Sequence, residues 1–217
     1  MTNATGHIDT FARDNLPPVA TWPEFLLDGF NYPPELNVGT ELTDAMVAKG
    51  FGDHTALIGN GRRRTYKELA DWTNRLAHVL VDDIGVQPGN RVLIRSANNP
   101  AMVACWLAAT KVGAVVVNSM PMLRSGELKK YVDKAQITYA LCDTRLMEEM
   151  EICAEGNDVL TRVMGFDGTS NHDAELDRLA LEKPVQFDAV KTMQDDVALL
   201  GFTSGSTGNP KATMHFH

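Results

Sequence analysis

The sequence has little cysteine, no long uninterrupted apolar run and no excess of positive charge. Its three cysteines, Cys105, Cys142 and Cys153, form no C-x-x-C pair and lie at no zinc-ligand spacing with a histidine, so no metal site is predicted. Reduced, buried thiols are typical of a cytoplasmic protein. The N-terminus lacks the basic-then-apolar layout of a signal peptide, and the most apolar stretch, residues 101–117, is interrupted by Lys111 and Gly113.

The charge balance narrows the range of partners. The 217 residues include 20 basic and 28 acidic side chains, which gives a formal net charge of −8. Such an excess disfavours general binding to nucleic acid or to an anionic membrane surface, and we expect neither as a partner. A small basic pocket for an anionic ligand stays compatible with this composition. The 44% of hydrophobic residues suffices for one sizeable core, or for part of a larger one.

The chain divides into two parts by composition. Residues 1–40 hold five prolines with aromatic residues between them, which predicts an extended N-terminal arm with a short helix near 24–28. In residues 41–217, apolar strand candidates at 55–58, 91–95, 114–118, 138–142, 159–166 and 197–202 alternate with helical patterns at 42–49, 66–80, 100–112, 126–135, 144–154 and 174–181. This alternation predicts an α/β fold with a mostly parallel sheet and helices on both faces.

Local signals place several element boundaries. Thr65 followed by Glu68 has the spacing of a capping box, so a helix should begin at residue 66. Asn60-Gly61 is a hairpin turn signal, and Ser125 is the expected N-cap of the helix that follows it. The sequence stops at His217, where residues 211–217 have just begun a strand pattern. We therefore expect the chain to be truncated within a domain.

A hydroxyl- and glycine-rich segment follows the last apolar strand of the parallel pattern. It consists of Thr203, Ser204, Gly205, Ser206, Thr207, Gly208, Asn209, Pro210 and Lys211. Glycine allows the backbone to approach an anion and to direct successive N–H groups into one concavity. Ligands in open α/β sheets bind beyond the carboxyl ends of the strands, where this loop would lie. The segment therefore indicates a site for the phosphates of ATP.

The spacing of this loop excludes two common nucleotide motifs. A P-loop requires lysine directly after its second glycine, but Asn209 and Pro210 intervene here, and the dinucleotide pattern G-x-G-x-x-G is absent from the loop. A solvated Ser/Gly-rich connection between two elements is the alternative that the composition alone leaves open.

Three stretches together resemble the adenylate-forming superfamily, which contains acyl- and aryl-CoA ligases, luciferases and peptide-synthetase adenylation domains. T-S-G-S-T-G-x-P-K, ending at Lys211, is similar to its signature phosphate loop. Arg64-Thr-Tyr-Lys-Glu-Leu69 resembles its early T-Y-x-E-L motif, and residues 107–121 resemble its G-A-x-x-x-P segment. One departure is Ala212, where the family usually has glycine. The resemblance implies the N-terminal subdomain of the adenylate-forming fold, with the residues from Thr203 to Gly208 and Lys211 at the phosphates.

Within the superfamily the details resemble a benzoate- or 2-aminobenzoate-CoA ligase. The resemblance implies an enzyme that joins an aromatic acid to the α-phosphate of ATP, releases pyrophosphate, and then transfers the acyl group to coenzyme A, with Mg²⁺ as the metal partner. The residues that contact adenine, magnesium and most of the acid come later in the family, so this chain alone is expected to be inactive. A small ATP-binding module without catalysis, or a fatty acyl-CoA synthetase, is the alternative. The sequence is also compatible with a homodimer.

Four further side chains are candidates for the site. His215 and His217 alternate along the last strand pattern, so one of them could face the acyl or adenylate pocket, although two ordinary strand histidines would give the same pattern. Arg124 and Arg145 follow strands and could meet the phosphates of coenzyme A, although surface arginines usually have no such role. Asp195 and Asp196, which lead into the strand at 197–202, are expected in a solvated turn rather than at a magnesium site.

Overall fold

A computed structural model describes residues 4–24, 29–169, 173–203 and 210–217 of the chain. Within them the α-helices are α1 (Phe11–Asp14), α2 (Val38–Glu41), α3 (Asp44–Met46), α4 (Tyr66–His78), α5 (Pro100–Lys111), α6 (Ser125–Ala135), α7 (Met147–Ala154) and α8 (Glu175–Leu181). The strands are β1 (Thr55–Gly59), β2 (Arg62–Thr65), β3 (Arg91–Arg95), β4 (Val115–Ser119), β5 (Tyr139–Asp143), β6 (Arg162–Phe166), β7 (Val197–Thr203) and β8 (Lys211–Phe216). Shorter helical turns lie at Val19–Thr21, Val47–Phe51, Val79–Ile84 and Thr144–Leu146.

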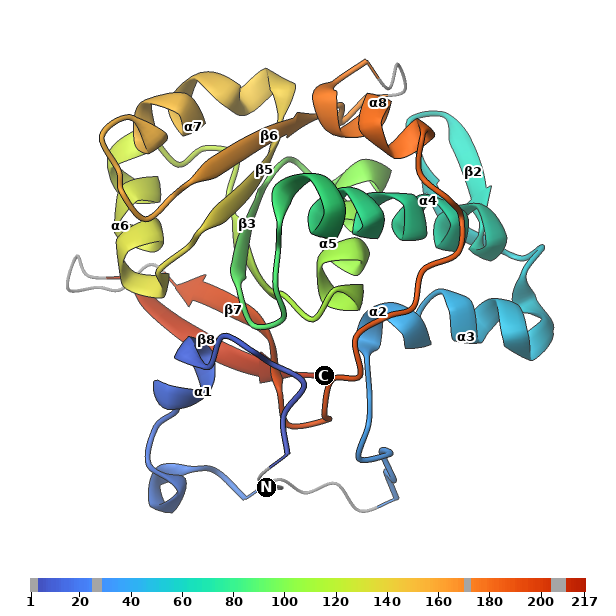
Figure 1. Ribbon diagram of the computed structural model, residues 1–217, viewed down its shortest axis with the longest axis horizontal. Coiled ribbons are helices and arrows are strands. Elements are labelled where there is room, and N and C mark those ends of the chain that lie inside the picture. Colours follow the sequence, from blue (N-terminus) through green and yellow to red (C-terminus); the bar gives the residue numbers. More distant parts are fainter. Residues whose placement is uncertain (1–3, 25–28, 170–172, 204–209) are drawn as a thin grey trace.

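The central sheet has six strands in the order β6-β5-β3-β4-β7-β8 (Figure 1). The pairings from β6 to β7 are all parallel, and β8 runs antiparallel to β7. The predicted α/β fold with a mostly parallel sheet is therefore confirmed. The carboxyl ends of β3 to β7 share one edge of the sheet, and because β8 runs antiparallel, its first residue, Lys211, lies at that same edge.

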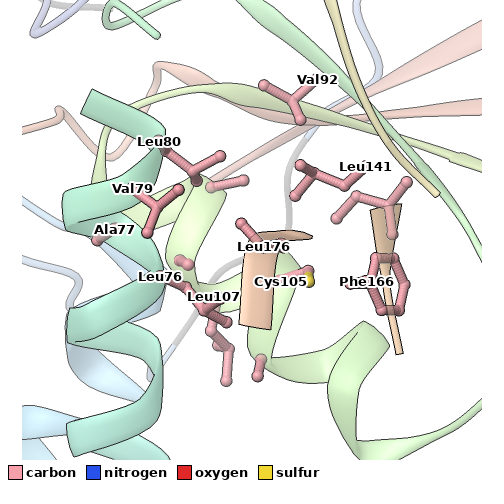
Figure 2. Packing of buried hydrophobic residues seen from close by; sticks show 14 of the residues in the cluster. Leu76, Ala77, Val79, Leu80, Val92, Cys105, Leu107, Leu141, Phe166 and Leu176 are labelled. Atoms are coloured by element: carbon pink, nitrogen blue, oxygen red, sulfur yellow. The ribbon is translucent and has the colours of Figure 1, made fainter. Parts of the chain in front are cut away.

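Helices cover both faces of this sheet, which explains why its strands are continuous apolar runs. On one face α4, α5 and α8 pack against Val92 of β3, Leu141 of β5 and Phe166 of β6, all nearly without solvent exposure (Figure 2). On the other face α6 and α7 pack against Leu93 and Val117. Cys105 and Cys142 lie buried on opposite faces as free thiols, as expected from their apolar surroundings.

The β1–β2 hairpin and α4 follow the local signals in the sequence. Asn60 and Gly61 form the turn with positive φ angles of 53° and 72°. The Thr65 hydroxyl accepts a hydrogen bond from the Glu68 N–H, and the Glu68 carboxylate accepts one from the Thr65 N–H, so the predicted capping box is present. None of the helices within the described ranges combines the length and apolar character that crossing a bilayer requires.

Two local predictions differ from the structure. The helix expected at 42–49 begins two residues later, at Asp44, because the chain bends at Thr43, whose buried hydroxyl donates to the Gly39 carbonyl. It continues from α3 into the turn Val47–Phe51, where Gly50 leaves helical geometry with a φ of 88°. The N-cap of α6 is Arg124 rather than Ser125, because the Glu127 carboxylate accepts from the Arg124 N–H. The helix expected near 24–28 falls on residues 25–28, outside the described residues.

The arm lies against the amino ends of the central strands. Its α1 precedes the turn at Val19–Thr21, and Trp22 stacks on Phe216 of β8 at 5.7 Å between ring centroids. Asp9 forms an ion pair with the buried Arg91 at the start of β3. Gly89, with φ of +89°, passes so close to Asp9 that an added Cβ would overlap the Asp9 carbonyl oxygen at 2.0 Å. These contacts fix residues 4–10 against the sheet.

A buried lysine joins three helices on the α4–α5 face. Lys111, at the end of α5, has no solvent exposure and donates to Asn74 of α4 and to the carboxylate of Asp44 in α3. Burial lowers the pKa of Lys111, and the hydrogen bond and charge of Asp44 oppose that shift. The ammonium charge is therefore tolerated only because Asp44 and Asn74 surround it.

Replacing Asp44 by alanine should leave the Lys111 charge buried without its counter-ion. We expect a loss of about 3 kcal/mol in the free energy of unfolding, measured by urea denaturation followed by circular dichroism at pH 7. The matched control is Glu41→Ala, which breaks an exposed pair with Lys49 and should cost less than about 1 kcal/mol. Equal losses in the two variants would show that Lys111 does not depend on Asp44.

Candidate functional site

The predicted phosphate loop is closed by the two strands that flank it. Thr203 ends β7 and is paired in register with Lys211, the first residue of β8. The Thr203 hydroxyl also donates to the Lys211 carbonyl at 3.4 Å. The loop residues Ser204, Gly205, Ser206, Thr207 and Gly208 lie outside the described residues, so only the two ends of the loop can be placed. Both ends lie at the carboxyl edge of the parallel strands, where the topology favours ligand binding.

An aromatic stack fixes β7 just before this loop. Phe202 lies against Tyr131 of α6, with ring centroids 3.9 Å apart and an interplanar angle of 14°. The contact joins the end of β7 to the helix that covers the same face of the sheet. The strand end that presents Thr203 is therefore held from its side as well as by its neighbours in the sheet.

Lys211 differs from the other basic candidates in its surroundings. Its side chain is exposed, and among the described residues no carboxylate lies within ion-pair distance of it. An unpaired ammonium at the carboxyl edge leaves one positive charge available to an anionic ligand.

Within the described part of the chain, no group of three or more histidine, cysteine, aspartate or glutamate side chains is placed to hold a metal ion.

Arg124 and Arg145 lie on neighbouring connections at the same edge, and each already has a carboxylate partner. Arg124 precedes α6 and bonds the Glu149 carboxylate at 2.8 Å, although its side chain is 78% exposed. Arg145 follows β5 and makes two bonds to the buried Asp143 carboxylate, at 2.9 and 2.6 Å. Burial alone would raise the pKa of Asp143, but the bonds and charge of Arg145 outweigh it and lower that pKa. Neither guanidinium is therefore free in this arrangement.

The two candidate histidines do not form one site. His215 lies on β8 with its Nε2 3.0 Å from the Thr213 hydroxyl, which also donates to the Gly201 carbonyl. His217 lies one residue beyond β8, at the opposite edge of the sheet from Lys211, and its Nδ1 accepts from the Val38 N–H at 3.2 Å. His215 therefore remains near the exposed surface of β8, whereas His217 is enclosed by the start of α2.

A cavity of about 710 Å³ lies between the arm and β8, within the size range of small-molecule sites. Its walls come from Asn15, Leu16, Pro17, Thr21, Trp22 and Pro23 of the arm and from Ala212, Thr213, Met214, His215 and Phe216 of β8. His215 is the only candidate residue from the sequence that lines it among the described residues.

Two charged residues are buried at the edges of the sheet. The turn expected before β7 is present, but Asp196 is not solvated: it is only 4% exposed, and its carboxylate accepts from the N–H groups of Gly6 and Met193. Arg95, at the end of β3, is 2% exposed and donates to four main-chain carbonyls after β4 and β5. In the sequence, the burial of Arg95 could have been inferred from its position at the end of an apolar strand pattern.

Comparison with known proteins gives a consistent picture. The chain is 28% identical over 183 residues to 3-hydroxybenzoate–CoA ligase of Aromatoleum sp. (strain CIB). The aligned region covers 84% of this chain and 35% of that protein. It is 31% identical over 174 residues to a medium/long-chain-fatty-acid–CoA/3-oxocholest-4-en-26-oate–CoA ligase of Mycolicibacterium smegmatis, covering 76% of this chain and 31% of that protein. The chain thus spans about a third of the length of these curated relatives.

The fold agrees with a solved structure of the same kind. The anthranilate CoA ligase AuaEII, in complex with anthranoyl-AMP, superposes with a TM-score of 0.77 at 19% identity, over 86% of this chain and 34% of that one. The family model described as AMP-binding enzyme matches residues 45–217, which include both ends of the phosphate loop. The chain therefore belongs to the family of AMP-binding, adenylate-forming enzymes.

Proposed function

We propose that this chain is the N-terminal part of an ATP-dependent aryl-CoA ligase. The observation that carries the proposal is the hairpin that pairs Thr203 with Lys211 and so fixes the ends of the Ser/Gly-rich loop at the carboxyl edge of the sheet. The Lys211 ammonium there has no carboxylate partner among the described residues. The similarity to a 3-hydroxybenzoate–CoA ligase, and the shared fold of an anthranilate CoA ligase, favour an aromatic acid as the substrate. We place the whole enzyme in the cytoplasm.

The reaction of the whole enzyme would have two steps. The carboxylate oxygen of the acid attacks the α-phosphorus of ATP, and the bond to the leaving pyrophosphate breaks, which gives an acyl-adenylate. The thiol of coenzyme A then attacks the acyl carbon, loses its proton and displaces AMP. The difficulty of the first step is charge, because an anionic acid must approach a polyanion.

The loop residues would offset that charge. We assign the residues from Thr203 to Gly208 to the β- and γ-phosphates, where main-chain N–H groups and hydroxyls can donate, and we assign Lys211 to the same side as a point charge. Bound Mg²⁺ would neutralise part of the phosphate charge. The role of these residues is positioning and electrostatic stabilisation, and none of them forms a covalent bond to the substrate.

The structure gives less support to a ligand-binding role for the two arginines and the two histidines. Arg124 and Arg145 would have to share their guanidinium groups between coenzyme A phosphates and the carboxylates of Glu149 and Asp143. His215 lies on the same strand as Lys211 and lines the cavity beside β8, so it is the better histidine for contact with a ligand. His217 is enclosed and is not assigned to substrate.

A fatty acyl-CoA ligase is the alternative substrate class, and the 31% identity to a medium/long-chain-fatty-acid–CoA ligase favours it. An ATP-binding module without catalysis is the alternative activity. The two substrate classes can be separated with a full-length enzyme that contains this chain. Its kcat/KM for adenylation is measured with aromatic and with aliphatic acids, and the preferred class gives the higher value.

Replacing Lys211 by alanine should weaken ATP binding about tenfold or more, since a charge-assisted hydrogen bond contributes about 1.5–3 kcal/mol. Isothermal titration with ATP and Mg²⁺ measures this change. Lys134→Ala, which removes an exposed lysine at the opposite end of α6, is the matched control and should leave the affinity unchanged. An unchanged affinity in the Lys211 variant would refute the phosphate assignment.

The 217-residue chain alone should release no pyrophosphate from ATP and Mg²⁺ with benzoate or 2-aminobenzoate. The reason is that the proposed site needs parts of the enzyme that lie in the other two thirds of the relatives' length. A coupled phosphate assay with added pyrophosphate as its positive control measures the rate. Turnover in the ordinary range of enzymes, about 1 s⁻¹ or faster, would show that this chain is catalytically sufficient.

A further inference from the structure

The far end of the β7–β8 hairpin is joined to the N-terminal arm through Asp196. The Asp196 carboxylate accepts from the Thr5 hydroxyl and from the Gly6 N–H, the latter at 2.8 Å. Its main-chain carbonyl accepts from the His217 N–H at 3.2 Å. Gly6 itself lies so close to the segment before β7 that an added Cβ would come 2.4 Å from the Lys191 carbonyl oxygen. One residue therefore connects the arm, the start of β7 and the end of β8.

Two imidazoles lie at this junction, one on a buried residue and one on a half-buried residue, and the Nε2 atom of each is buried. His7, which follows Gly6 on the arm, is 7% exposed, and its Nε2 is buried without a hydrogen-bond partner among the described residues. The Nε2 of His217 is likewise buried and has no hydrogen-bond partner within the described part of the chain. Because His217 accepts from the Val38 N–H at Nδ1, its neutral ring must carry its proton at Nε2. Asp196 joins the two segments that carry these rings, because it accepts from the N–H of Gly6, next to His7, and from the N–H of His217 itself.

The junction is suited to neutral rings only. A proton added to either imidazole would create a buried cation with an N–H that has no acceptor there, and protonating both would place two like charges together. We propose that His7 and His217 form an acid-sensitive latch, which fastens the arm and the β7–β8 hairpin together while both rings are neutral and opens when they take up protons.

The surrounding charges act on the rings in opposite directions. Asp196 and Asp9 favour the protonated form of His7, whereas Arg13 and Arg91 oppose it, and the ion pair with Arg91 offsets the effect of Asp9. Lys191 and Glu35, on the adjoining segments, pair with each other at the surface. For His217 the facing groups are His7, which opposes protonation, and Asp196, which favours it.

Burial is the largest effect on both rings. It lowers the pKa of His7, and it lowers the pKa of His217 from 6.5 to about 4. A histidine whose pKa is lowered in the closed state stabilises that state fully above pH 6.5, and this stabilisation is lost as the pH falls from 6.5 towards 4. The Asp196 carboxylate stays ionised in this window, because hydrogen bonds from Met193, Thr5 and Gly6 outweigh its burial and lower its pKa.

Hydrogen exchange of single amides, followed by NMR on the 217-residue chain, tests the latch. The Gly6 N–H reports on the arm, the Val38 N–H reports on His217, and the Val92 N–H in β3 reports on the core. After correction for intrinsic exchange rates, protection of Gly6 and Val38 should fall about tenfold or more between pH 7.0 and pH 5.0, while that of Val92 stays constant. Equal protection at both pH values would overturn the proposal, as would an equal fall at Val92, which would indicate global unfolding.

A pair of variants separates the histidines from other titrating groups. The double variant His7→Gln, His217→Asn keeps neutral polar groups in both places and should show the same protection of Gly6 at pH 7.0 and pH 5.0. His54→Gln, at an exposed histidine, is the control and should keep the full pH dependence. Persistent pH dependence in the double variant would overturn the proposal.

The unmodified chain offers a test that needs no substitution. The ring protons of His217, followed by NMR across the same pH range, should titrate well below pH 6.5 and together with the Gly6 amide. A His217 midpoint near 6.5, or a Gly6 shift that does not follow it, would show that the ring is not part of a closed latch.

Discussion

A buried cation in a parallel sheet must find all its hydrogen-bond partners inside the protein, and β3 carries one at each end. Arg91 donates to the carbonyls of Gly89, Ala135 and Gln136 and pairs with Asp9, while Arg95 donates to carbonyls in the connections after β4 and β5. β3 is a central strand with β5 on one side and β4 on the other. The two guanidiniums therefore hold connections on both flanks of the sheet, at opposite edges.

Arg95 also shapes the edge of the sheet at which the ends of the proposed phosphate loop lie. Arg95 occupies the carboxyl end of β3 and binds the connection after β4, including the carbonyls of Met120, Pro121 and Leu123. The carboxyl end of β3, beside the point where the strand order changes direction, is thus occupied by the protein's own side chain. Beyond β4 in the sheet, β7 ends at the same edge with Thr203, which is paired with Lys211 of β8.

The sequence predicts those features of this fold that depend on local or repeating patterns. Continuous apolar runs identify β3, β4, β5 and β7 because both faces of the sheet are covered, and the reciprocal bonds of Thr65 and Glu68 need only residues three apart. Burial of charge does not follow from such patterns. Lys111, Arg95 and Asp196 become buried because segments distant in the sequence supply Asp44, the Met120 carbonyl and the Gly6 N–H. Arg145 is a different case: it was a plausible phosphate ligand in the sequence, but the structure pairs it with Asp143, a partner only two residues away.

The β7–β8 hairpin connects the carboxyl edge of the sheet with the amino edge, where the N-terminal arm lies. At the carboxyl edge it pairs Thr203 with Lys211, and at the amino edge it pairs Val197 with Phe216, directly before His217. Because paired strands transmit a displacement along their length, loosening the Asp196 junction would reduce the restraint on Lys211 although no charged group at the loop has changed. The arm, which lies outside the sheet, thus contacts the strand pair that carries the proposed phosphate loop. An enzyme of the proposed kind would gain from this restraint, since preorganised donors stabilise developing charge without having to rearrange.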